Sequence, residues 1–416
     1  MTTKLKNISI IMLALAALSC SDLGTEPGSP IRTPHPMPPL DLAQQSVVHS
    51  SNWFGMNLFK QLNAGSTGRN LMISPLSVSM ALGMTLNGAR GATKDAMAQT
   101  LGVVSRSSDQ INTTYSEVIQ GLTNLDPTVQ MDIGNSIWYS PILQVEQAFK
   151  DVNTTCFYAQ IRSLDFAAPG ASGVINGWVG DATHGKIPTI VPDPIPDSIV
   201  MYLINAIYFK GSWTHQFDPS STRAEVFHES DGSTAPCQMM NIQDTIPCFI
   251  DSALECVDLP YGLVGFSMTI VLPPEGVNID QFIATEISSE RIAAWSTRLR
   301  KSEVRLSMPK FKLEYKETLT EVLKQLGMGI AFSNAADFTG IDKRGSLAIS
   351  EVLHKTFIQV DEVGTEAAAV TSVAVGATAI GGGIPSIVLD RPFVYVIREH
   401  ASGTILFIGK LARPEW

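Results

Sequence analysis

The sequence predicts an α+β fold with mostly antiparallel sheets, because helical periodicity comes first along the chain and many strand-like runs follow. Hydrophobic residues make up 44% of the 416 residues and charged residues 16%, which is typical of a globular protein with a sizeable core. No repeat period is visible, and no shift in composition divides the chain after residue 40. We therefore expect a single domain over residues 41–416.

Two helices are expected at the start of this domain. Apolar residues recur at helical spacing between Val47 and Phe59, Asp41 is a suitable N-cap, and Gly65 follows the last turn. The second helix begins after Ser74-Pro75, since proline is tolerated in the first turn. Gly88 is a natural end for it.

The later part of the chain changes to a strand period. The run 200–209 is nearly all apolar, which predicts a strand covered on both faces. The segment 403–408 is expected to close a hairpin with 393–398. The other expected strands are 133–138, 257–261 and 266–272.

The first residues have the pattern of an export signal. Residues 1–19 combine a positive start, an apolar stretch too short to span a membrane as a stable helix, and a small residue before Cys20. This resembles a bacterial lipoprotein signal in which Cys20 receives the lipid, with plain secretion as the alternative. Residues 20–40 hold six prolines and read as a Pro-rich tether. We expect an extracytoplasmic protein, either a lipoprotein at the outer membrane or cell surface or a secreted one.

The charge and the cysteine content limit which binding partners, metal sites and disulfides are expected. The formal net charge is −10 and no basic stripe is present, so nucleic acid is not an expected partner. No cysteine pair has zinc-ligand spacing with histidine, and neither a metal nor a cofactor is expected. Export allows disulfides among Cys156, Cys237, Cys248 and Cys256, and a bridge between Cys248 and Cys256 across a hairpin competes with four buried thiols.

One segment near the C-terminus fits neither a loop nor a single strand. After Glu366 the chain has no charge until Asp390, and small and β-branched residues dominate it. In an extended strand alternate residues face one side, and here that side would carry only side chains that are easily buried. These side chains are Thr365, Ala367, Ala369, Thr371, Val373 and Val375. The pattern suggests a loop that becomes a buried strand in a second state.

Several motifs in order resemble the serpin family, over about residues 41–416. Asn70–Ser77 resembles its N-x-x-x-S-P-x-S motif and Asn205–Trp213 its N-A-x-Y-F-K-G-x-W strand. The further matching landmarks are Leu259-Pro260-Tyr261, Met308-Pro309-Lys310-Phe311, Leu326-Gly327-Met328, His354-Lys355, Asp390–Phe393 and Gly403–Lys410.

This resemblance implies a large central β-sheet, two smaller sheets, eight or nine helices and an exposed reactive-centre loop over about residues 362–390. It also implies a hinge, the part of the loop that must enter the central sheet. The hinge residues are Glu362, Gly364, Thr365, Glu366, Ala367, Ala368, Ala369, Val370 and Thr371. Inhibitory members are cleaved fourteen positions after the glycine that matches Gly364, which implies Thr378-Ala379 as the reactive bond. Ala377 and Ile380 are competing positions.

The resemblance implies suicide inhibition of a serine protease by acyl-enzyme formation followed by loop insertion. The small residues around Thr378 suit an elastase-like target, and a papain-like cysteine protease is a second class of target. Ser74, Ser77, Asn205 and His354 match the family's shutter, the place where the sheet parts, and Trp213 matches the breach at its top. No nucleophile-elbow glycines surround either serine, so an enzyme is not expected.

Two functions therefore remain. The first is an exported, monomeric inhibitor that forms a covalent complex with its protease and touches a membrane only through a lipid anchor. The second is a non-inhibitory serpin that acts as a binding or carrier module. Non-inhibitory members tend to have bulky, charged or proline residues in the hinge, and Thr365–Thr371 has none beyond Glu366 on its outward face. The hinge thus favours the inhibitor.

Overall fold

The computed structural model describes residues 33–365 and 384–416, and this part of the chain is α+β. Its helices are α1 (Leu42–Ala64), α2 (Pro75–Leu86), α3 (Gly91–Thr100), α4 (Ser108–Asn124), α5 (Gln147–Phe157), α6 (Ala171–Ala182), α7 (Ile279–Glu286), α8 (Ser289–Arg298) and the short α9 (Thr320–Leu323). Nine α-helices in the described ranges agree with the eight or nine expected.

The described strands form two hydrogen-bonded sheets. The six-stranded sheet has the order β10 (Phe311–Thr318), β11 (Leu353–Val360), β12 (Gly364–Thr365), β4 (Met201–Ser212), β2 (Val129–Tyr139) and β3 (Gln160–Ser163). The nine-stranded sheet contains β1 (Leu71–Ile73), β15 (Ile405–Leu411), β14 (Phe393–Glu399), β8 (Phe266–Leu272), β7 (Glu255–Tyr261), β6 (Thr234–Ile250), β9 (Arg300–Pro309) and β13 (Ser386–Val388), with β5 (Arg223–His228) paired to β6.

The family resemblance implies two smaller sheets, but their strands are joined in the nine-stranded sheet. Strand β6 is 17 residues long, and it pairs with β7 at its last residues and with β9 along most of the rest. Strand β6 therefore joins the strands that follow β7 in the sheet to those that follow β9. Only the pairs β2–β3 and β9–β13 are parallel in the described part, which confirms the mostly antiparallel prediction.

The two expected N-terminal helices are confirmed, and their caps explain where they start. Asp41 accepts a hydrogen bond from the Gln44 amide while the Gln44 side chain accepts from the Asp41 amide, which is a capping box at the start of α1. The Ser74 hydroxyl accepts from the Ser77 amide at the start of α2, where Pro75 is the first helical residue.

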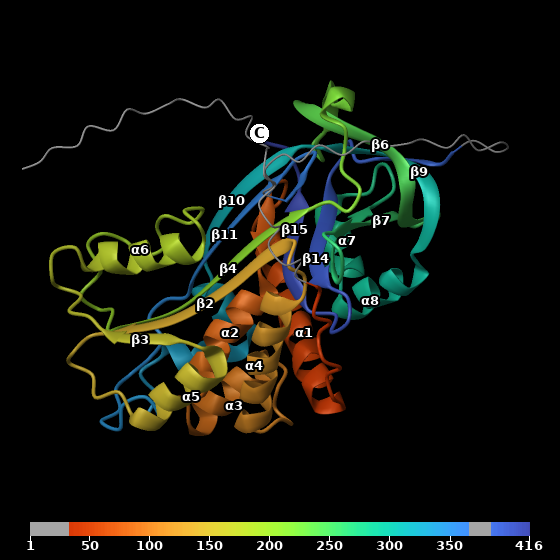
Figure 1. Cartoon of the computed structure of the whole chain (residues 1–416). Helices are drawn as coiled ribbons and strands as arrows, with labels where there is room; N and C mark the ends of the chain where they lie inside the picture. Colours follow the sequence, from red (N-terminus) through yellow and green to blue (C-terminus); the bar gives the residue numbers. More distant parts are fainter. Residues whose placement is uncertain (1–32, 366–383) are drawn as a thin grey trace, which may run out of the picture. The chain divides into compact units, whose positions relative to one another are not determined.

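Strand β4 is covered on both faces, as its apolar sequence predicts. Ile207 and Phe209 belong to the main core, into which α2 also packs, whereas Tyr202 and Ile204 belong to a second core formed with α6. Figure 1 shows α6 on one side of the six-stranded sheet and α2 on the other. The sheet is therefore sandwiched where β4 and β11 run beside each other.

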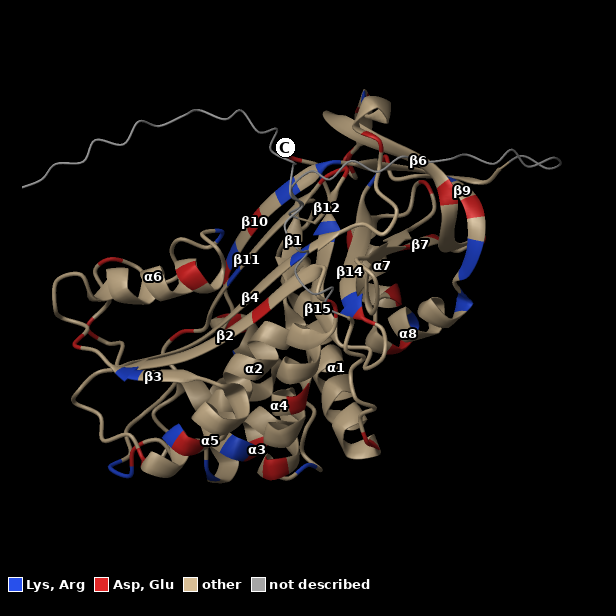
Figure 2. Cartoon of the chain, in the orientation of Figure 1, with Lys and Arg blue, Asp and Glu red and all other residues tan. Residues whose placement is uncertain are grey.

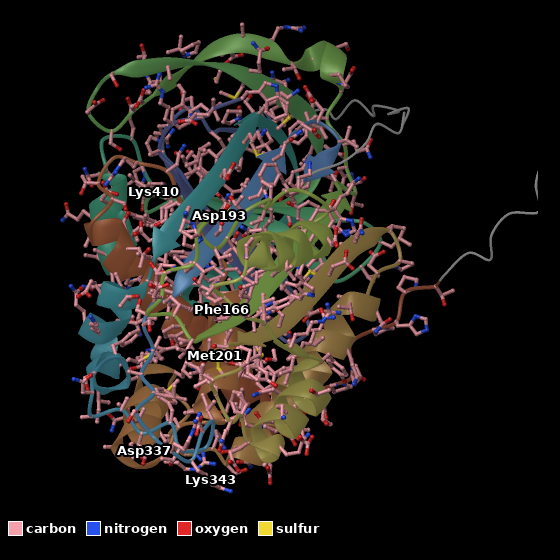
Figure 3. The ribbon with its side chains drawn as sticks, turned by 90° about the vertical axis from the view of Figure 1, so that its left-hand side faces the viewer. Phe166, Asp193, Met201, Asp337, Lys343 and Lys410 are labelled. Carbon is pink, nitrogen blue, oxygen red and sulfur yellow. The ribbon has the colours of Figure 1, made fainter. Side chains whose placement is uncertain are left out.

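A buried lysine joins the nine-stranded sheet to the helices. Lys410 on β15 is fully buried and labelled in Figure 3. Its ammonium group donates to Asn63 at 2.7 Å and to the Ser66 carbonyl at 3.0 Å, and it forms an ion pair with Asp280. All three protons have acceptors, which is what a buried ammonium group requires.

The four cysteines of the described part carry free thiols. Strand register places Cys248 opposite Val257 and Cys256 opposite Phe249. Directly opposed residues share a face and successive residues alternate, so the two thiols point to opposite faces of the sheet. The hairpin disulfide between Cys248 and Cys256 is therefore not formed, and the buried-thiol alternative holds for Cys237, Cys248 and Cys256.

Charges of both signs alternate along the exposed strands. Figure 2 shows basic and acidic residues interspersed on β9 and β10, without a stripe of one sign. Within residues 33–365 and 384–416, no helix combines the length and the apolar character needed to cross a bilayer. In the same ranges, no cluster of three or more His, Cys, Asp or Glu could hold a metal ion.

Candidate functional site

The beginning of the hinge already lies inside the six-stranded sheet. Gly364 pairs with Ser212, and Thr365 pairs with Gly211 of β4 on one side and with Val360 of β11 on the other. Gly364 is required by close approach, since a Cβ atom there would lie 2.1 Å from the Gly211 carbonyl oxygen. Any other residue would force the strands apart at this point.

A tight acidic turn directs the chain into this strand. The Asp361 carboxylate accepts hydrogen bonds from the amides of Val363 at 3.0 Å and Gly364 at 3.2 Å. The Asp361 amide donates to the Gly364 carbonyl at 3.0 Å. Burial raises the pKa of Asp361, and the two amides that bind its charged form counteract that shift.

Glu362, the next residue of the turn, is anchored by its side chain to Lys310 and Thr222. Its carboxylate lies 3.0 Å from the Lys310 ammonium group and accepts from the Thr222 hydroxyl at 2.7 Å. Burial acts to raise the pKa of Glu362, but the hydrogen bonds from Thr222 and Lys310 outweigh it and the net shift is downward. The Phe217 amide donates to its main-chain carbonyl at 2.9 Å.

Trp213 connects the turn to the strand. Its main-chain amide donates to the Val363 carbonyl at 2.8 Å, and its indole N–H donates to the Asp361 carbonyl at 2.9 Å. The indole ring stacks on Tyr261 with 4.4 Å between ring centroids, and the Tyr261 hydroxyl is hydrogen-bonded to Thr365. Trp213 therefore contacts the turn directly, at Asp361 and Val363, and reaches Thr365 of the hinge through Tyr261.

The four residues matched to the shutter lie together between α2, β4 and β11. The Ser74 amide donates to His354 Nε2 at 3.1 Å, and the Ser77 amide donates to the Ser74 hydroxyl at 3.2 Å. The Ser77 hydroxyl reaches the Asn205 carbonyl at 3.4 Å. Because His354 Nε2 is an acceptor, the ring is neutral with its proton on Nδ1.

Burial governs the chemistry of this cluster. His354 is buried, and burial lowers the pKa of its imidazole to about 4. The Asn205 amide group donates to Asn135 at 2.8 Å, but within the described residues the buried Asn205 Oδ1 has no hydrogen-bond partner. An unpartnered buried oxygen is costly, so a donor group brought to this position would be stabilising.

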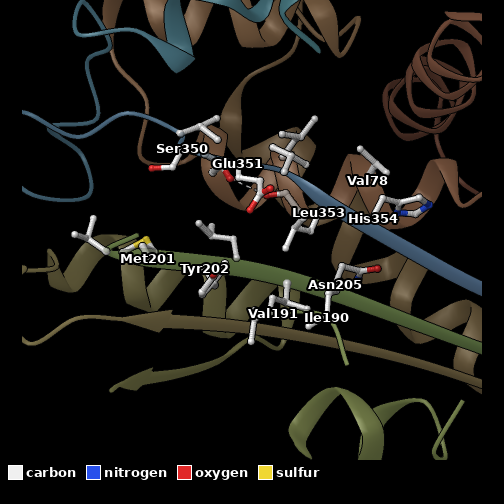
Figure 4. A pocket seen from close by; sticks show the side chains of 18 of the residues that line it. Val78, Ile190, Val191, Met201, Tyr202, Asn205, Ser350, Glu351, Leu353 and His354 are labelled. Carbon is white, nitrogen blue, oxygen red and sulfur yellow. Dashed lines mark hydrogen bonds between the residues drawn. The ribbon is translucent and has the colours of Figure 1, made fainter. Parts of the chain in front are cut away.

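A cavity of about 110 Å³ adjoins the shutter. Figure 4 shows side chains from the green strand β4, including Tyr202 and Asn205, and from the blue strand β11, including Leu353 and His354, around it. Val78 of α2 lines the same space. Strands β4 and β11 share no pair in the described ladders, and β12 lies between them at one end.

A Ser–His–Asp cluster is present elsewhere, but its geometry is not catalytic. In the nine-stranded sheet the Ser267 hydroxyl lies 2.7 Å from His400 Nε2 and 2.8 Å from Asp258. The same ring nitrogen faces both partners, so the aspartate does not orient the ring through the other nitrogen as a catalytic triad requires. Ser267 is also fully buried. We interpret the cluster as a structural network.

Part of the expected site lies outside the described residues, namely Cys20, Glu366–Thr371, Thr378 and Ala379. Sequence reasoning missed the direct partners of the hinge: Lys310, Tyr261 and Thr222. Lys310 and Tyr261 stand in the motifs quoted above, but nothing in the sequence indicates that they meet the hinge. The six remaining histidines are exposed except for His215, which is half-buried against Asp244.

Comparison with known proteins agrees with this geometry. The family model described as "Serpin (serine protease inhibitor)" matches residues 49–414. The chain belongs to the serpin family. Among curated relatives, this serpin is 31% identical to intracellular coagulation inhibitor 2 of Tachypleus tridentatus, with 89% of this chain and 92% of the relative covered. It is 34% identical to the corticosteroid-binding globulin of Ovis aries, with coverage of 94% and 88%.

Solved structures show the same fold. The thermophilic serpin tengpin in its native state has a TM-score of 0.82 and 31% identity, with 92% of this chain and 97% of tengpin covered. Human thyroxine-binding globulin, in complex with its hormone, has a TM-score of 0.82 and 28% identity, with coverage of 90% and 100%. Serpins are mostly protease inhibitors rather than enzymes, although members such as corticosteroid-binding globulin are non-inhibitory.

Proposed function

We propose that this serpin is an exported suicide inhibitor of a serine protease with a shallow, apolar S1 pocket. The observation that carries the proposal is strand β12, in which Gly364 and Thr365 pair with β4 and with β11. Two residues of the hinge thus occupy the first positions of a strand that has room to lengthen between these neighbours.

The register of β12 supports the proposal, because it can be extended along the chain. If the strand lengthened in the same register, Thr371, six residues beyond Thr365, would come opposite Asn205 on β4 and opposite His354 on β11. Thr365 faces inward to Tyr261, so every second residue after it shares that inward face. Ala367 and Ala369 are small enough for this face, and Thr371 brings a hydroxyl group to the shutter.

The shutter supports this inserted state chemically. Asn205 Oδ1 is buried and has no partner in the described part of the chain, and the Thr371 hydroxyl is a donor that would satisfy it. Each added ladder hydrogen bond contributes about 1 kcal/mol net. Insertion is therefore favourable, and the uninserted state is maintained by a kinetic barrier.

The covalent step uses the protease's own chemistry. Its serine hydroxyl attacks the Thr378 carbonyl carbon, and the bond to the Ala379 nitrogen breaks as that nitrogen takes up the proton. The Thr378 carbonyl is then an ester of the protease serine. Cleavage frees the hinge to insert, which carries the bound protease away from where it attacked and distorts its catalytic site before water can hydrolyse the ester.

The test is to mix the serpin with an elastase-like protease and examine the products by denaturing electrophoresis and mass spectrometry. We expect a complex that resists SDS, cleavage after Thr378, and a higher melting temperature of the cleaved serpin. Cleavage within 375–381 that gives neither a complex nor a gain in thermal stability would overturn the inhibitor and favour the second function, a non-inhibitory binding or carrier module. A trypsin-like protease is the matched control, because no Arg or Lys lies between Gly364 and Asp390.

We further propose that Cys20 carries a lipid anchor after removal of residues 1–19, with 20–40 as a tether to the folded domain. The support is the order of a positive start, a short apolar stretch and Ser19-Cys20. Metabolic labelling with a fatty-acid analogue should mark the wild-type protein and not the Cys20→Ala variant. Equal labelling of the two proteins would rule the anchor out, and no labelling of either would favour plain secretion.

A further inference from the structure

Trp416 lies over the lysine that anchors the hinge. The Lys310 ammonium nitrogen is 4.1 Å from the centroid of the Trp416 ring, which is within the range of a cation–π interaction. The segment that carries Trp416 is held beside β10, because the Lys312 amide donates to the Glu415 carbonyl at 2.7 Å. The ring remains 59% exposed, so filling the core is not its main role.

The same ammonium group connects Trp416 to the hinge. Lys310 approaches the Glu362 carboxylate at 3.0 Å, and the Lys310 side chain is only 17% exposed. Glu362 stands two residues before Gly364, the first residue of β12. One face of the ammonium group therefore meets an aromatic ring and another meets the carboxylate at the base of the hinge.

We propose that Trp416 is a positioning residue for the hinge, holding Lys310 against Glu362 and so fixing the point from which the strand lengthens. A flexible lysine side chain has many rotamers, and an aromatic ring over its head restricts them to those that reach Glu362. The ring also keeps water from one side of the ion pair, which strengthens the pair. The consequence for inhibition rests on the function proposed above, but the contact itself does not.

The effect should appear first as opening of the hinge turn. The amides of Val363 and Gly364 donate to Asp361, so their hydrogen exchange reports how often the turn opens. Loss of an exposed cation–π contact should raise this exchange about two- to fivefold. Loss of inhibitory activity on prolonged warming, through insertion without cleavage, should accelerate by a similar factor while the association rate with protease stays unchanged.

The experiment compares hydrogen exchange in the full-length wild type, Trp416→Leu and Trp416→Phe. Leucine keeps apolar bulk without a π face, whereas phenylalanine keeps a π face. We therefore expect faster exchange of the amides of residues 363 and 364 in Trp416→Leu. In Trp416→Phe, exchange of these amides should be close to that of the wild type. Both substitutions are repeated in a Lys310→Met background, where the difference should disappear. Trp53→Ala, at a tryptophan of α1 that is 41% exposed, is the control for loss of a surface indole.

The outcomes separate the possibilities. Faster exchange in Trp416→Leu alone, lost in the Lys310→Met background, supports the positioning role. This holds even if neither the wild type nor the variants form a protease complex, and in that case only the proposed inhibitory function fails. Wild-type exchange in Trp416→Leu overturns the role. Equal increases in Trp416→Leu and Trp416→Phe, or an effect that persists without Lys310, would also overturn it, because the ring would then act through its size and not on the lysine.

Discussion

Thr365→Arg should convert this serpin from an inhibitor into a substrate while leaving the fold intact. Thr365 is 3% exposed, bonded to Tyr261 and enclosed between Gly211 and Val360. An arginine there would bury a cation with no counter-charge, which costs several kcal/mol. The strand would stay outside the sheet, and a barrier about 3 kcal/mol higher would slow insertion by roughly a hundredfold. The protease would then complete hydrolysis first.

The measurement is the number of serpin molecules consumed per protease inactivated, which should rise at least tenfold. Glu366→Arg is the matched control, because alternation in the inserted strand puts residue 366 on the outward face. It should leave this ratio close to the wild-type value. Stoichiometric inhibition by Thr365→Arg would show that loop insertion is not the mechanism.

Acidification between pH 6.5 and 4 should weaken the shutter through His354. Burial lowers the pKa of His354 from 6.5 to about 4 in the folded protein. The unfolded chain therefore binds a proton in this range that the folded protein does not, and folding stability falls as the pH is lowered. A shift of this size corresponds to roughly 3 kcal/mol of unfolding free energy, fully present above pH 6.5 and lost by about pH 4.

Urea unfolding of the wild type and of His354→Gln at several pH values measures this contribution. Glutamine offers an acceptor for the Ser74 amide and does not titrate, so the difference between the two curves isolates the histidine. Other buried groups, such as Asp361 and Glu362, contribute equally to both proteins. If the two curves fall in parallel as the pH is lowered, His354 is not responsible for acid sensitivity.

The parts of the fold predictable from sequence are those with a local cause. The capping box at Asp41 and the proline after Ser74 specify the starts of α1 and α2 within a few residues of chain. The alternation from Thr365 onward predicts which small residues a longer strand would bury, but of these only Thr365 lies in the described residues and in a strand. The family motifs identified the four shutter residues, although their roles remain predictions.

The parts that could not be predicted depend on contacts between distant segments. Glu362 meets Thr222 from 140 positions away, and Thr365 meets Tyr261 from 104 positions away. No periodicity in either segment encodes the other, because such pairing depends on sheet register and not on local pattern. The unpartnered oxygen of Asn205 could not be predicted either, because it depends on which groups the fold brings to that side chain. Its amide group has a partner in Asn135, whereas its oxygen has none among the described residues.

The stacking of Trp213 on Tyr261 gives the protein a built-in optical probe. Trp213 is hydrogen-bonded to Asp361, and Tyr261 is hydrogen-bonded to Thr365, so both rings contact the segment that we propose to insert. Indole emission responds to its hydrogen bonds and to neighbouring polar groups, and a Trp213→Phe variant separates its signal from those of the other five tryptophans. Strand lengthening could thus be followed in real time by stopped-flow mixing with unlabelled protein, without attaching a dye to the loop.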